Sequence, residues 1–142
     1  MSIPSFQRTA GRLRAEQAAF QLAQSLRVAH EQAVVGSREV RWAWDRERLR
    51  AHLAPVAVED AEGEDAASPD APGPSDSAAL PAGTVVTVRE PPAAAECACV
   101  RFFPQGTSEA AVLAVSIDAH PFTIAVDAAT SHIRLTAGSA AR

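Results

Sequence analysis

The sequence predicts an α+β fold, with one long N-terminal helix packed on an antiparallel β-sheet or β-sandwich. Three observations lead to this prediction. Residues 1–35 have the 3.6-residue apolar period of a helix, the period changes to two after Gly36, and short apolar runs separated by turn residues fill the remainder. Because no helix pattern alternates with these runs, a parallel α/β sheet is not expected.

Length and composition fit an ordinary globular domain. A chain of 142 residues can form one domain with a real core that needs no disulfide or metal. The net charge of −4 disfavours a general nucleic-acid binder, so we do not expect nucleic acid as a partner. No run approaches the roughly 18–20 apolar residues of a membrane span, and no signal peptide is visible.

The predicted helix has two apolar faces, although a small domain needs only one. The first face consists mainly of alanine and can lie flat on a sheet; we expect helix-on-sheet packing through Leu22, Leu26, Ala29 and Ala33, preceded by Ala15, Ala18 and Ala19. The second face is a stripe with a spacing of seven: Phe6, Leu13 and Phe20. A bare stripe of large apolar residues predicts a partner interface. The alternative is that a β loop of the same chain covers it.

The helix start and stop are marked by proline and glycine. Pro4 suits the first turn, and Gly36-Ser37 supplies the stop expected of a C-terminal glycine. We therefore divide the chain into an N-terminal amphipathic helix, residues 1–36, and an antiparallel β domain, residues 37–142.

The first strand of the β domain carries alternating large apolar residues. Val40, Trp42 and Trp44 alternate with Arg41 and Ala43, and a second strand-like stretch covers residues 49–58. We interpret the three large residues as one buried strand face. The alternative is that the tryptophans, interleaved with arginines, stack single-stranded nucleic acid.

An acidic segment, residues 59–83, interrupts the strand pattern. It carries seven acids and no base, and it is rich in Ala, Pro, Gly and Ser. We predict a long mobile loop. A calcium loop is the weaker interpretation, because Gly63 is misplaced for an EF-hand and the distal bidentate glutamate is missing.

Further strands are predicted in series, as a meander, at residues 84–89, 97–103, 111–117, 122–126 and 133–135. Cys97 and Cys99 are two residues apart, so on a strand both point the same way, and a bridge between them would be strained. We interpret them as two reduced or separately buried thiols, with a disulfide as the alternative.

No group of residues in the sequence has the spacing of a catalytic, metal or cofactor site. Ser116, Asp118 and His120 are close in sequence but lack a nucleophile elbow or a glycine-rich loop. The four histidines are scattered, and no two share metal-ligand spacing. We therefore predict no catalytic, metal-binding or cofactor-binding residues, and a role in assembly rather than catalysis.

Two local motifs follow one another along the chain. The first is the helix end, residues 22–33, followed by Val40 and Trp42. The second is the hairpin Val-Arg-Phe-Phe-Pro-Gln-Gly-Thr-Ser at residues 100–108, with Phe102, Pro104 and Gly106 as its motif residues. In this order they resemble the motifs of the H-type minor pseudopilin of bacterial type II secretion (GspH) and of the related FimT/FimU minor pilins of type IV pili. His30 stands where the family usually has Arg. Ser131-His132 replaces the glycine of the family's final motif.

The resemblance implies a pilin-like fold and a structural role near the tip of a short pseudopilus that contributes to protein export. The implied partners are the I, J and K minor pseudopilins and the major pseudopilin, and the acidic loop could touch secreted exoproteins. It also implies a leader cleaved by a prepilin peptidase, an N-methylated start and an inner-membrane anchor ahead of residue 1, with this domain in the periplasm. The alternatives are a type IV minor pilin acting in adhesion or DNA uptake, and a free periplasmic binding module.

Overall fold

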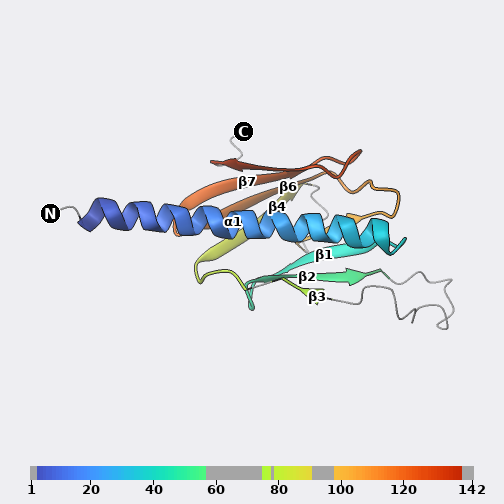
Figure 1. The fold of residues 1–142 in the computed structure, drawn as a ribbon, viewed down its shortest axis with the longest axis horizontal. Coiled ribbons are helices and arrows are strands. Elements are labelled where there is room, and N and C mark those ends of the chain that lie inside the picture. Colours follow the sequence, from blue (N-terminus) through green and yellow to red (C-terminus); the bar gives the residue numbers. More distant parts are fainter. Residues whose placement is uncertain (1–2, 57–74, 78, 91–97, 139–142) are drawn as a thin grey trace.

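One long helix packs on two antiparallel sheets in the computed structural model, which describes residues 3–56, 75–77, 79–90 and 98–138 (Figure 1). The helix α1 is Ile3–Val35. The first sheet has the order β3-β2-β1-β5, with β1 Val40–Asp45, β2 Arg50–Pro55, β3 Ser75–Asp76 and β5 Cys99–Phe102. The second has the order β4-β6-β7-β8, with β4 Thr84–Glu90, β6 Ala111–Ile117, β7 His120–Val126 and β8 Ile133–Ala137. The predicted fold class is confirmed.

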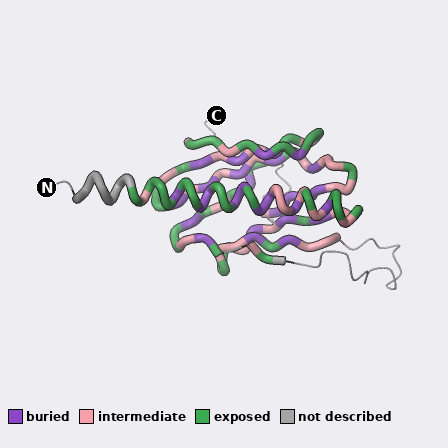
Figure 2. The backbone as a smooth tube through the Cα atoms, viewed as in Figure 1, coloured by how far each residue is buried: buried purple, intermediate pink, exposed green. Residues whose placement is uncertain are grey.

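The helix lies across both sheets, and its first turns extend beyond the strands (Figure 1). Buried and exposed positions alternate along it with the helical period (Figure 2). The small-residue face is the buried one and is at most 3% exposed: Ala15, Ala18, Ala19, Leu22, Leu26, Ala29 and Ala33. Because most of these side chains are single methyl groups, the helix backbone can lie close to both sheets.

The helix ends in a Schellman motif whose left-handed residue is Ser37, not the glycine. The Gly36 N–H still donates to the Gln32 carbonyl at 2.9 Å, as a helical residue does. The Ser37 and Arg38 N–H groups then fold back onto the carbonyls of Val34 (3.3 Å) and Ala33 (3.2 Å), and Ser37 has a φ of 50°. The predicted end of the helix is therefore right, but the conformation expected of the glycine belongs to its neighbour.

Replacing Ser37 by glycine should stabilise the domain by about 1 kcal/mol, because the serine Cβ is strained in the left-handed region and glycine is not. Urea unfolding of both forms measures the difference. The matched control is Gly36→Ala, which should not destabilise, because Gly36 is outside the left-handed region. The assignment of the left-handed conformation to Ser37 is wrong if Gly36→Ala lowers the stability of the domain.

The first sheet is joined to the helix by a buried polar contact. Val40, Trp42 and Trp44 are all buried, so their interpretation as one buried strand face is confirmed and base stacking on these tryptophans is ruled out. The Trp42 Nε1–H donates to the Ser25 Oγ at 2.8 Å, and that hydroxyl donates to the Leu22 carbonyl at 2.6 Å. The contact connects α1 to β1 inside the core.

The second sheet is partly a meander. β6, β7 and β8 are consecutive neighbours, but β4 pairs with β6, and β5 crosses to pair with β1 in the first sheet. The prediction of strands in simple series is therefore wrong for β5. β7 also begins at His120, earlier than residue 122, because Asp118 and Ala119 form a tight turn with φ values of 49° and 68°.

The end of the acidic segment is ordered, which corrects the prediction of a mobile loop through residue 83. Ser75–Asp76 forms β3 against β2, and Leu80 is buried while its N–H donates to the Leu49 carbonyl at 2.7 Å. Residues 57–74 and 78 lie outside the described residues. The Leu80 side chain, which comes from this polar segment, is thus part of the hydrophobic core.

Cys99, the first residue of β5, is disulfide-bonded. The interpretation of reduced thiols is therefore wrong for this residue. Cys97, the other cysteine of the sequence, lies outside the described residues.

Candidate interaction surface

The outer face of α1 carries large apolar side chains that the described part of the chain leaves exposed. Leu13 is 59% exposed and Phe20 is 56% exposed. Contrary to the alternative interpretation of the stripe, no loop within the described residues covers Leu13 or Phe20. Phe6 belongs to α1, but its side chain is outside the described part of the chain.

Polar side chains border the Phe20 ring. The Arg27 guanidinium lies 5.9 Å from the ring centroid, a cation–π distance, and its Nη1 donates to the Gln24 Oε1 at 3.4 Å. One turn closer to the N-terminus, Arg12 and Glu16 form an ion pair at 3.5 Å. An exposed aromatic ring inside a polar rim is the usual form of an interface anchor.

A second apolar pair lies at the far end of the helix. Val34 and Val35 are 43% and 80% exposed, and they lie in the last turn of α1, where the Val34 carbonyl accepts the Ser37 N–H of the Schellman motif. The sequence prediction passed over both residues. Their exposure could have been predicted from the helical period, because neither residue lies on the alanine face of the helix.

The hairpin motif builds a turn that packs beside the helix end. Phe102 is fully buried, and the Phe103 N–H closes the turn by donating to the Thr107 carbonyl at 2.8 Å. Gly106 has a φ of 93°, which glycine adopts without strain, while Pro104 lies in the same turn. These residues shape the backbone, and none of them presents a reactive group.

His30 and Ser131, the two departures from the family pattern, both contact this hairpin. The His30 ring is edge-on to Phe102 with centroids 6.4 Å apart, and its Nδ1 is buried with no hydrogen-bond partner in the described part of the chain. The Ser131 Oγ donates to the Gly106 carbonyl at 3.0 Å, and Ser131 has a φ of 56°. The left-handed backbone explains why a glycine suits this position in the family pattern.

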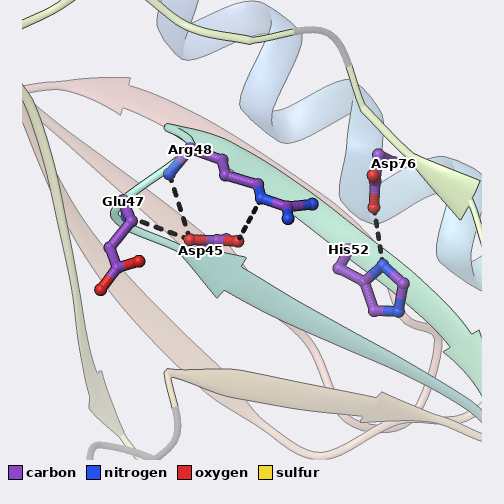
Figure 3. A network of polar contacts seen from close by, with 5 residues as sticks. All are labelled: Asp45, Glu47, Arg48, His52 and Asp76. Atoms are coloured by element: carbon purple, nitrogen blue, oxygen red, sulfur yellow. Dashed lines mark hydrogen bonds and ion pairs between the residues drawn. The ribbon is translucent and has the colours of Figure 1, made fainter.

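A polar network on the first sheet connects residues far apart in sequence (Figure 3). His52 Nδ1 on β2 lies 2.6 Å from Asp76 Oδ1 on β3, and this hydrogen bond lowers the pKa of Asp76, with Arg50 and Arg48 acting in the same direction. Nearby, the Asp45 carboxylate accepts the N–H groups of Glu47 and Arg48 and stabilises the β1–β2 turn. The His52–Asp76 contact holds the short β3 against β2.

The described residues contain no cluster of three His, Cys, Asp or Glu side chains that could hold a metal ion. Ser116, Asp118 and His120 fall on the β6–β7 hairpin, and no hydrogen bond recorded for the described residues joins them. Hydrogen bonds from the Thr130 hydroxyl and N–H lower the pKa of Asp127, which stabilises a turn. The described helix lacks an apolar stretch long enough to cross a membrane.

The family model described as type II transport protein GspH matches residues 18–138 of the chain. No curated protein sequence matches. The matched range covers most of the small-residue face of α1, both sheets and the hairpin motif, and it begins after Leu13.

Two solved proteins share the fold. The minor pseudopilin EpsH from the type 2 secretion system of Vibrio cholerae superposes with a TM-score of 0.58 at 12% identity, over 87% of this chain and 97% of that one. The type IV minor pilin FimU of Pseudomonas aeruginosa superposes with a TM-score of 0.63 at 13% identity, over 89% of this chain and 94% of that one. A second crystal form of FimU gives a TM-score of 0.58 at 13% identity, over 87% and 96%.

Proposed function

This chain belongs to the GspH family of type II transport proteins, and we propose that it is a minor pseudopilin that acts as a structural subunit of a type II secretion pseudopilus. Its work is assembly with other pilin-like subunits, not chemistry. In this role the chain is anchored in the inner membrane by a segment ahead of residue 1, and the two sheets lie in the periplasm.

The exposed stripe on α1 is the observation that supports this proposal. Leu13 and Phe20 leave more than half of their surface in water although the domain beneath them has a complete core. Burying one such side chain between subunits is worth roughly 1.5–3 kcal/mol. Phe6, if it continues the stripe, extends the contact along the first turns, which reach beyond the strands (Figure 1). The proposed partners are the major pseudopilin and the I, J and K minor pseudopilins.

Replacing Phe20 by aspartate should leave the isolated domain folded and impair assembly and secretion. The side chain is mostly in water, so the folded domain loses little. An interface that buries Phe20 would instead have to bury a charge. The measurements are thermal unfolding of the domain and export of secreted proteins by a deletion strain that carries the variant.

The matched control is Gln21→Asp, which changes a side chain that is exposed on the same helix but lies about 100° around the helix axis from Phe20. It should preserve both stability and export. If Phe20→Asp unfolds the domain, the stripe is part of the core and the proposal fails. If the variant folds and both export and surface pili are normal, the stripe is not an interface.

A type IV minor pilin is the second candidate function, because the fold superposes on FimU as well as on EpsH. The same deletion strain separates the two. Loss of protein export with normal pili supports the secretion role. Loss of surface pili with normal export assigns the chain to a pilus instead.

A further inference from the structure

The exposed stripe of α1 continues beyond Phe20 and includes a charge. Arg27 and Val34 follow Phe20 at the same spacing of seven residues, so both lie on the same side of the helix. Val34 is 43% exposed, whereas Arg27 is half-buried. Together with Leu13 these residues form one row along the outer face of α1, about 32 Å long at about 1.5 Å per residue. The third member of this row is a guanidinium between apolar side chains.

Contacts within the chain hold the Arg27 side chain in place. Its guanidinium lies 5.9 Å from the centroid of the Phe20 ring, and it donates to the Gln24 Oε1 and to the Ile133 carbonyl, both at 3.4 Å. All three contacts are with neutral groups. Glu31, one turn further along the helix, is exposed and forms no ion pair with Arg27. Within the described residues, the positive charge of Arg27 therefore has no counter-charge.

The missing counter-charge constrains which partner can cover the stripe. In the isolated domain, water solvates the open side of the half-buried guanidinium. A subunit that covers the Phe20 ring also covers the guanidinium beside it, because the two groups are in cation–π contact. Removing an unpaired charge from water costs more than the burial of one aromatic ring gains. The stripe is therefore buried favourably only by a partner that supplies a negative charge at this point.

We propose that the subunit that packs on the outer face of α1 carries an aspartate or glutamate opposite Arg27, between apolar contacts at Phe20 and Val34. A carboxylate fits because a guanidinium presents its N–H groups in a planar fork that matches the two carboxylate oxygens. A basic or entirely apolar partner surface would leave the charge of Arg27 buried and unpaired.

Arg27 is thus a specificity-determining residue of the interface. The apolar members of the row supply contact area to any hydrophobic surface, whereas the charge selects the partner and fixes its register along the helix. This inference rests on the proposed function, from which it takes the neighbouring subunit, and it adds the chemistry by which that subunit is recognised.

The test places a photo-crosslinking residue at Val34 of the full-length protein in its own cells. We expect an adduct with a neighbouring subunit that maps beside an aspartate or glutamate. Arg27→Glu should lower the yield of this adduct at least about tenfold, because two carboxylates then meet in the interface. Arg27→Lys keeps the charge but not the planar fork, so it should lower the yield less.

Exchange of the two charges tests the pair directly. Once the adduct has identified the acidic residue of the partner, its replacement by arginine should lower the yield as Arg27→Glu does. The two changes together should restore most of the yield, because opposite charges face each other again. A loss caused by misfolding of this chain would not be restored in this way.

Arg14→Glu is the matched control, because Arg14 is exposed on the same helix but lies about 120° around the axis from Phe20. It changes the net charge identically and should keep the full yield. Thermal unfolding of the isolated domain should show only a small loss for Arg27→Glu, because the two hydrogen bonds that it removes are long. If Arg27→Glu is nevertheless unstable, Arg27→Gln is the second variant and should also lower the yield.

The proposal is overturned if no adduct forms, if the adduct maps to a segment without an acidic residue, if Arg14→Glu lowers the yield as much as Arg27→Glu, or if the exchanged charges do not restore it. Export separates this inference from the proposed function. Loss of export in Phe20→Asp, with an adduct that is insensitive to Arg27→Glu, would reject the carboxylate and retain the function. An adduct that depends on Arg27, with normal export in Phe20→Asp, would retain the carboxylate and reject the function.

Discussion

Replacing Trp42 by alanine should lower the free energy of unfolding by about 3–5 kcal/mol, the cost of removing a large buried aromatic side chain. Trp42 is fully buried in the core, where its indole N–H reaches the helix at the Ser25 Oγ. Chemical denaturation of the isolated domain measures the loss. The milder Trp42→Phe keeps most of the ring volume and should fold with a smaller loss.

The hydrogen bond within this contact can be measured separately. Ser25→Ala leaves the buried Trp42 N–H without its acceptor, and the expected cost is about 1–3 kcal/mol. In a Trp42→Phe background the same serine change should cost much less, because no indole N–H remains to be satisfied. Equal costs in both backgrounds would show that the bond does not join α1 to β1.

Enlarging the small-residue face should be the second large effect. Ala29→Leu adds three carbon atoms at a position with no exposed surface, where the helix lies close to the sheets, and should destabilise the domain by about 1–3 kcal/mol. The sheets cannot yield locally, because β1 and β8 both contact the same helix. Thermal unfolding of the isolated domain shows the change.

Gln24→Leu is the control for the enlarged face, because it adds an apolar residue to the exposed side of the same helix. Its stability should remain within about 0.5 kcal/mol of the unmodified domain. If both leucine variants unfold alike, helix propensity or aggregation is responsible and the close packing of Ala29 is not.

The periodic parts of the fold could be predicted from the sequence because each element carries its own period. α1 ends at Val35 as predicted, and β6 has the predicted bounds, Ala111–Ile117. The alternating tryptophans also identified a buried strand face. Local patterns of this kind depend only on which neighbours along the chain share a face.

Of the candidate interaction surface, the sequence could predict only the residues whose exposure follows from their position around the helix. The spacing of Leu13 and Phe20 placed them opposite the alanine face, and both are exposed. That β6 is the described neighbour of β4 could not be foreseen, since the sequence of a strand does not say which other strand it pairs with. The His52–Asp76 contact joins residues 24 apart through β2–β3 pairing, which no local pattern reports.

The sequence by itself determined the order and type of the elements other than β3, the two faces of the helix and the family to which the chain belongs. The tertiary structure alone decided which sheet each strand joins, because β5 leaves its neighbour β4 to pair with β1, a choice set by long-range packing. It also decided that Ser37 and Ser131 take left-handed backbones that sequence patterns assign to glycine. Ser37 is held by the local hydrogen bonds of the helix end, whereas the Ser131 hydroxyl donates to the Gly106 carbonyl, a bond that exists only once distant segments have met.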